Sequence, residues 1–154
     1  MSNLDQYIQD ITELHLASHQ QLRETITGLD TDALNWTPAP DTSSIGTAIT
    51  HMLGAEAEVL RNLLDIPTER VRDSEFASQT HQLDTLLKLL DSVVADWETL
   101  ASRLHDSDLA VLRPRPNKPI PQSGLYWLAR NYGHVREHTA QVMLTWQLYQ
   151  LQHA

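Results

Sequence analysis

Two histidines stand four residues apart in the last long apolar segment of the chain, in the stretch GHVREHTAQ of residues 133–141. In an α-helix, residues with this spacing lie on one face, with their β-carbons roughly 5–6 Å apart. The imidazoles of His134 and His138 could therefore reach a single metal ion. Helical pairs of this kind also occur by chance, as two solvated or hydrogen-bonded histidines. A third ligand is therefore needed before the pair predicts a metal site.

His51 is the best candidate for this third ligand. On a helical projection it lies about 70° from the centre of the apolar stripe of its own segment, and the pair also lies on the flank of its stripe. At about 1.5 Å per residue, His51 is roughly 12 Å into its helix, and His134 and His138 are roughly 16–22 Å into theirs. If these two helices run antiparallel, the three side chains meet near mid-height. The spacing therefore permits a metal site at these residues.

The chain contains no cysteine, so disulfides, thiolate ligands and a cysteine nucleophile are excluded. A transition metal would have to be held by histidine, carboxylate and water, and three imidazoles suit several metals, zinc, nickel, iron and manganese among them. HVREH also matches the HxxEH pattern of one class of zinc protease. Such enzymes need a further acidic ligand downstream, and no aspartate or glutamate follows Glu137. We reject the protease interpretation.

Several side chains could support this site or line a pocket beside it. His15 forms a second HxxxH with His19 and lies in the apolar stripe of its helix, so we expect a core histidine with a hydrogen-bond partner; the alternative is a pocket residue or ligand. Glu58, two turns beyond the third candidate ligand, could orient a ligand or act as a base, or be a solvated acid. Trp127 shares the strip of the histidine pair and is placed near a pocket. The other histidines are expected at the surface: His81, His105 and His153.

Four amphipathic helices must position these residues. The first runs from about residue 3 to 27 and is closed by Gly28, where a left-handed conformation is expected. A connector with a short helical turn follows. The apolar spacing then predicts three more helices: one capped by Ser43 or Ser44 and ending near Ile66-Pro67, one with apolar residues from Leu83 to Leu104, and one capped by Ser123.

These elements predict an all-α four-helix bundle in a single domain, residues 1–154. The apolar spacing does not fix the topology of the bundle. We find no convincing strand, and residues 105–122 are expected to form a long proline-rich loop.

The charge and the apolar content of the chain argue against two classes of function, nucleic-acid binding and membrane insertion. The net charge is −9, with 20 acidic against 11 basic residues, which argues against nucleic-acid binding because that binding depends on cationic contacts to phosphates. No apolar run approaches the length of a membrane span, and the N-terminus lacks the features of a signal peptide. We therefore expect a cytoplasmic protein that does not bind a membrane.

The stretches SIGTAITHMLGAE and YGHVREHTAQVMLTWQL, with the connector LDTDALNWTPAPDTSSIG, resemble the DinB-like (YfiT-like) superfamily of metal-dependent enzymes over nearly the whole chain. This resemblance implies up-down-down-up topology and a bundle that is often dimeric. It also implies a divalent metal, typically zinc or nickel, held by His51, His134 and His138. Gln141 matches a glutamine that often follows the pair in the family, as a support for the ligands or a substrate contact.

The resemblance also suggests an activity. The family includes thiol S-transferases that act with low-molecular-weight thiols, and a thiol-dependent maleylpyruvate isomerase whose site has a glutamate ligand where this chain has histidine. We therefore predict a homodimeric, metal-dependent enzyme that activates a thiol or water, of the S-transferase or hydrolase type, with a small-molecule substrate. The residues do not identify a catalytic group. One alternative is a non-catalytic protein that binds a metal or small molecule; another is a helical interaction module in which the histidines are incidental.

Overall fold

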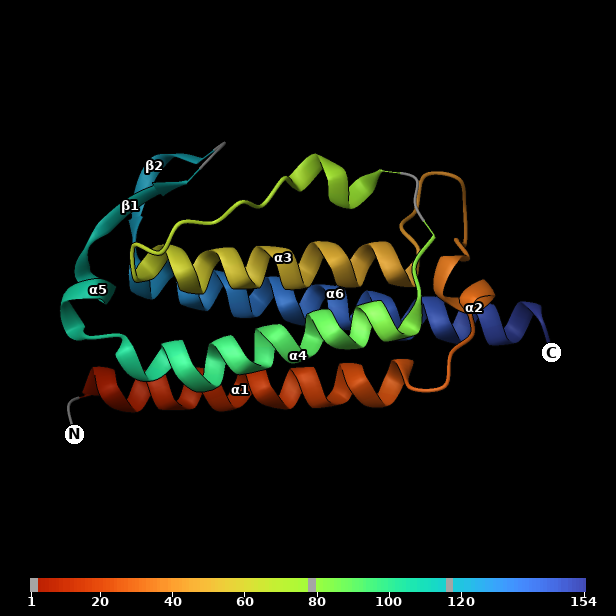
Figure 1. Cartoon of the computed structure of the whole chain (residues 1–154), viewed down its shortest axis with the longest axis horizontal. Helices are drawn as coiled ribbons and strands as arrows, with labels where there is room; N and C mark the ends of the chain where they lie inside the picture. The colour runs from red at the N-terminus through yellow and green to blue at the C-terminus, as the bar shows by residue number, and fades with distance from the viewer. Residues whose placement is uncertain (1–2, 78–79, 116–117) are drawn as a thin grey trace.

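The computed structural model describes residues 3–77, 80–115 and 118–154. Four long helices pack side by side (Figure 1): α1 (Asn3–Ile26), α3 (Ile45–Leu63), α4 (Leu83–Leu100) and α6 (Gly124–Gln152). Helices α1 and α6 run in one direction along the long axis, and α3 and α4 run in the other. The predicted all-α four-helix bundle with up-down-down-up topology is confirmed.

The long helices enclose one hydrophobic core, to which each contributes an apolar face. Leu22, Met52, Leu90 and Leu128, one from each helix, are fully buried. Burying such a side chain contributes about 1.5–3 kcal/mol, so this core supplies the main driving force for packing. No helix in the described part of the chain is both long and apolar enough to span a membrane.

The predicted N-terminal caps of α3 and α6 and the closing glycine of α1 agree with the structure, while α3 ends at Leu63, before the predicted Ile66-Pro67. Of the two candidate caps of α3, Ser44 is the one used, since its hydroxyl accepts a hydrogen bond from the backbone N–H of Thr47. Ser123 caps α6 in the same way, through the N–H of Tyr126. Gly28 has a φ of 87°, the left-handed conformation that closes α1. These caps fix where α3 and α6 begin, and hence the height of each histidine along the bundle.

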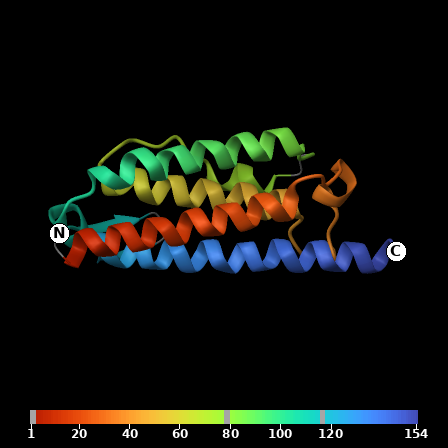
Figure 2. The ribbon, with the colours of Figure 1, turned by 90° about the horizontal axis from the view of Figure 1, so that it is seen from below.

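Short elements fill the connections: α2 (Thr31–Asn35), the 3-10 helices η1 (Arg72–Phe76) and η2 (Ala101–Arg103), α5 (Asp106–Ala110), and the antiparallel strands β1 (Leu112–Arg115) and β2 (Lys118–Ser123). The expectation of a long proline-rich loop over residues 105–122 is therefore wrong for the described part of this segment, which forms α5 and two strands. Both strands of a two-stranded hairpin are edge strands, in which proline is tolerated. Figure 2 shows α1 lying against α6, whose C-terminal end runs past the other helices.

The expectation that His81 lies at the surface is also wrong. Its side chain is buried against α3 at Gly46, where an added Cβ would come within 2.5 Å of the imidazole ring. The Asn35 side chain accepts a hydrogen bond from the backbone N–H of His81 and donates one to its carbonyl. Glycine on α3 therefore allows the segment before α4 to pack closely on the bundle.

Candidate metal centre

The antiparallel pairing of α3 and α6 brings together the three histidines singled out in the sequence. The Nε2 atoms of His51 and His134 are 3.2 Å apart. The ring of His138 lies 5.2 Å from that of His51 and 4.5 Å from that of His134, between centroids. One nitrogen from each ring lies within 4.8 Å of the other two. The three imidazoles therefore form a cluster that could hold a single ion.

Two side chains fix the tautomers of this cluster. The Nδ1–H of His51 donates to the Oε2 of Glu75 at 2.9 Å, and the Nδ1–H of His138 donates to the Oε1 of Gln141 at 2.9 Å. A neutral imidazole that donates through Nδ1 carries its lone pair on Nε2. In both histidines, Nε2 is thus the nitrogen left for a metal. Hydrogen bonds of this kind commonly orient histidine ligands and raise their basicity.

The residues present fit a divalent metal. Metal–nitrogen bonds of about 2.0–2.1 Å at tetrahedral angles separate two nitrogens by about 3.3 Å, close to the spacing of His51 and His134. Burial, together with the neighbouring histidines, lowers the pKa of His134 to about 3, and burial also lowers the pKa of His51. Both are therefore neutral near pH 7, which is the form that binds metal. In the described part of the chain, His134 Nδ1 is buried without a hydrogen-bond partner.

An ion-pair network surrounds His51. Arg70 donates to both carboxylate oxygens of Glu75, at 2.6 and 2.8 Å, and to Glu58 at 2.9 Å. Two carboxylates and one guanidinium leave one negative charge beside the three imidazoles, which favours a cation. Gly54 makes the close approach of Glu75 to α3 possible, because an added Cβ would lie 2.5 Å from the Glu75 Oε1. Phe76 packs against the His51 ring, with centroids 4.7 Å apart and the rings tilted by 46°.

A second cluster lies between α1, α3 and α4. The Nδ1–H of His15 and the Nε2–H of His19 donate to the Oε1 of Glu56 at 2.5 and 2.9 Å, and the indole N–H of Trp97 donates to the same oxygen at 2.6 Å. All four side chains are buried. The expectation of a core histidine with a hydrogen-bond partner is confirmed for His15. These two histidines and Glu56 are also close enough to hold a metal ion.

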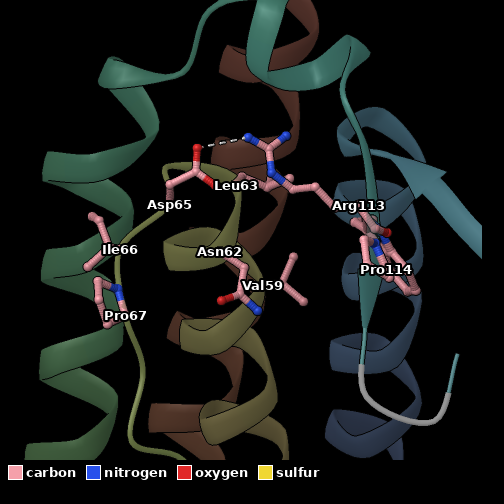
Figure 3. Close-up of a pocket in the computed structure, with 9 residues that line it drawn as sticks. Val59, Asn62, Leu63, Asp65, Ile66, Pro67, Arg113 and Pro114 are labelled. Carbon is pink, nitrogen blue, oxygen red and sulfur yellow. Dashed lines mark hydrogen bonds and ion pairs between the residues drawn. The ribbon is translucent and has the colours of Figure 1, made fainter.

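The remaining predicted residues lie along the same face of α3 and α6 as the three-histidine cluster. Glu58 is held by Arg70, and Gln141 contacts His138. Trp127 is buried, and its indole N–H donates to the backbone carbonyl of Arg113 at 3.1 Å. It lines a pocket of about 360 Å³ between α3, the segment that follows it, and β1 (Figure 3).

Sequence reasoning missed three polar residues of these clusters. Glu75 and Arg70 lie in a connector without apolar periodicity, which gave no signal for either. Glu56 did give one, because it stands four residues after Met52 and directly after Ala55, within the apolar stripe of α3. A carboxylate in that stripe indicates a buried, hydrogen-bonded acid.

These features define a four-helix bundle with a histidine cluster between its second and fourth long helices. The model of the DinB superfamily matches residues 14–142, and the chain belongs to this superfamily. A crystal structure of a conserved protein from Enterococcus faecalis has a similar fold, with a TM-score of 0.71 and 17% sequence identity over 91% of this chain and 95% of the other. No curated protein matches the sequence.

Proposed function

We propose that this protein is a metal-dependent enzyme in which His51, His134 and His138 hold a divalent cation, zinc or nickel. The proposal rests on one observation: three imidazoles meet at one point, and hydrogen bonds at the Nδ1 atoms of two of them leave Nε2 free to bind a metal. A bound divalent ion would supply Lewis acidity, lowering the pKa of a coordinated thiol or water at neutral pH. The reaction would be thiol S-transfer, with a low-molecular-weight thiol, or hydrolysis of a small-molecule substrate.

The residues of this chain would prepare the site for that chemistry. Glu75 holds the tautomer and ring orientation of His51, and Arg70 holds Glu75 through two hydrogen bonds. Gln141 orients His138 in the same way. Phe76 covers one side of the His51 ring and limits the access of water there.

A non-catalytic metal-binding protein is the second candidate. Both carboxylates near the cluster, Glu58 and Glu75, are ion-paired with Arg70, so neither is an unengaged base. An enzyme would then depend on the ion alone to generate its nucleophile. A protein that stores or senses a metal would need no base at all.

We also propose that the protein forms a homodimer through α6. Leu144, Leu148 and Leu151 are exposed and follow one another at spacings of four and three residues, which places them on one stripe of the helix. An exposed apolar stripe of this kind is typical of a protein–protein contact.

Metal content, measured by mass spectrometry on untagged protein, tests the proposed site. The wild type should contain close to one zinc or nickel per chain, and His51→Ala and His138→Ala should lose it. His153→Ala, in the exposed C-terminal tail, is the matched control and should keep the metal. His19→Ala, checked for folding by circular dichroism, should also keep it, because His19 belongs to the second cluster.

The outcomes separate the alternatives. A wild type that stays empty after reconstitution with zinc and with nickel would exclude the metal mechanism. Metal lost from His19→Ala but kept by His51→Ala would assign it to the second cluster. If the loaded wild type transfers thiols or hydrolyses esters no faster than His138→Ala, the non-catalytic alternative is favoured.

A further inference from the structure

The pocket beside Trp127 lies on the same side of the α3–α6 pair as the three-histidine cluster. On α3, Val59 and Asn62 line the pocket and follow His51 by eight and eleven residues, or about 12 and 16 Å along the helix axis. On α6, Trp127 precedes His134 by seven residues, or about 10 Å. Because α3 and α6 are antiparallel, both steps lead in one direction, toward the hairpin (Figure 1). A ligand in the pocket would therefore lie on the side of the α3–α6 pair that carries the cluster, and a longer ligand would point toward the histidines.

The walls of the pocket combine apolar surface with two polar groups. Ile66 and Pro67 form one side, and Arg113 and Pro114 form the other (Figure 3). Trp127, whose indole contacts the backbone of Arg113, also lines the pocket. The polar groups are the guanidinium of Arg113 and the side-chain amide of Asn62. Within the described part of the chain, no hydrogen bond is found for the Asn62 amide. The pocket thus suits a ligand with an apolar body and a polar end.

The guanidinium of Arg113 is only partly satisfied by the protein. One nitrogen donates to the backbone carbonyl of Asp108 at 2.9 Å. The other lies 3.4 Å from the carboxylate of Asp65, whose side chain is 84% exposed while that of Arg113 is 14% exposed. An ion pair with so exposed a partner is long and screened by water, and therefore weak. A ligand carboxylate entering the pocket could replace Asp65 with a shorter, better-shielded contact.

The backbone holds this arginine in place. The carbonyl of Arg113 accepts the indole N–H of Trp127, which ties β1 to α6. On the opposite wall, Asp65 takes a positive φ of 54° two residues after the end of α3, where the chain turns toward Ile66 and Pro67 on the pocket wall. The two walls are thus fixed before any ligand binds.

We propose that this pocket binds the non-reacting part of the substrate, and that this part is an apolar group carrying a carboxylate, with Arg113 as the specificity-determining residue. The inference deepens the proposed function, on which it rests for the place of the reacting group. The carboxylate would lie about 10 Å or more from that group. Since the protein has a net charge of −9, it repels anions in general, and a preference for an acid would be a property of this pocket.

Binding of 3-phenylpropionate, with its uncharged amide as the control ligand, tests the pocket. Both are too short to reach the histidine cluster, so binding is measured without metal, in the presence of a chelator. The reporter is the NMR signal of the Trp127 indole N–H, assigned with Trp127→Phe. We expect the acid to shift this signal and to bind at least about tenfold more tightly than the amide, as a charge-assisted hydrogen bond allows.

Substitutions test whether Arg113 is the residue that gives the pocket its preference for the acid. Arg113→Gln should weaken binding of the acid at least about tenfold and abolish its preference over the amide. Arg103→Gln removes the same charge from an exposed position that does not line the pocket, and should bind like wild type. His51→Ala should also bind the acid normally, so a failure of the metal site leaves this result unaffected.

Three results would overturn the inference: neither ligand shifts the Trp127 signal, the amide binds as tightly as the acid, or Arg113→Gln keeps the preference for the acid. If the protein binds no metal but binds the acid normally, the proposed metal-dependent function is overturned and the inference about the pocket stands.

Discussion

The buried carboxylate of Glu56 should make the unfolding free energy of this protein depend on pH, and a single substitution of Glu56 should remove that dependence. Glu56 has no exposed surface and accepts hydrogen bonds from His15, His19 and Trp97. Burial alone would raise its pKa, but the hydrogen bonds and the coulombic attraction of the two histidines together outweigh burial and lower the pKa from 4.5 to about 2. The ionised form is therefore the one that the fold stabilises.

The size and sign of the effect follow from this shift. Each pKa unit corresponds to about 1.36 kcal/mol, so the shift is worth on the order of 3 kcal/mol of unfolding free energy. Because the pKa of Glu56 is lower in the folded than in the unfolded state, this stabilisation is present above about pH 4.5 and is lost as the pH falls toward about 2. Glu56→Gln cannot ionise. We expect it to lower the unfolding free energy by about 3 kcal/mol at about pH 6, and the melting temperature by roughly 6–12 °C.

Urea denaturation measures the unfolding free energy and thermal unfolding measures the melting temperature, each followed by circular dichroism in the presence of a chelator. The difference between wild type and Glu56→Gln should shrink steadily from about pH 4.5 to about pH 2.5. Glu98→Gln, an exposed acid on α4, is the matched control and should change stability by less than about 0.5 kcal/mol. A loss below about 1 kcal/mol in Glu56→Gln, or a difference from wild type that stays constant with pH, would refute the reasoning.

Two further predictions concern the ligand support and the exposed stripe of α6. Glu75→Gln should weaken zinc affinity about 10–100-fold, measured by competition with a chelating dye, because it removes the charged acceptor of the His51 Nδ1–H. Glu69→Gln, exposed in the same connector, should keep the wild-type affinity, and equal affinities for the two variants would show that Glu75 does not act through His51. Leu148→Glu should convert a wild-type dimer to a monomer in sedimentation velocity, whereas Gln147→Glu, which adds the same charge at an exposed neighbouring position, should leave the dimer intact. A monomeric wild type, or a Leu148→Glu dimer, would contradict the proposed contact.

The sequence predicted the helices and the histidine cluster because both depend on local periodicity. The spacing of His134 and His138 puts them on one face of any helix, and the polar caps at Ser44 and Ser123 set the two helix starts from which heights can be counted. His51 could be matched to the pair because helical rise and an antiparallel arrangement decide which heights meet.

The contacts that complete the cluster could not be predicted in this way. Glu75 reaches His51 from a connector whose path is set by tertiary packing, namely by Arg70 and by the room that Gly54 leaves. The hairpin was missed because prolines are excluded from the interior strands of a sheet. A two-stranded hairpin has only edge strands, which accept proline. His81 was misplaced because its burial depends on a glycine 35 residues earlier in the chain.

Helix α3 carries one member of each polar cluster, His51 toward α6 and Glu56 toward α1 and α4, only five residues apart. Each residue turns an α-helix by about 100°, so inserting or deleting one residue between them would swing one side chain away from its partners while the other stayed in place. Evolution can lengthen or shorten the connectors on either side of α3 without this penalty. Homologous proteins that keep both clusters should therefore show gaps before and after this helix, and an unbroken alignment across positions 51–56.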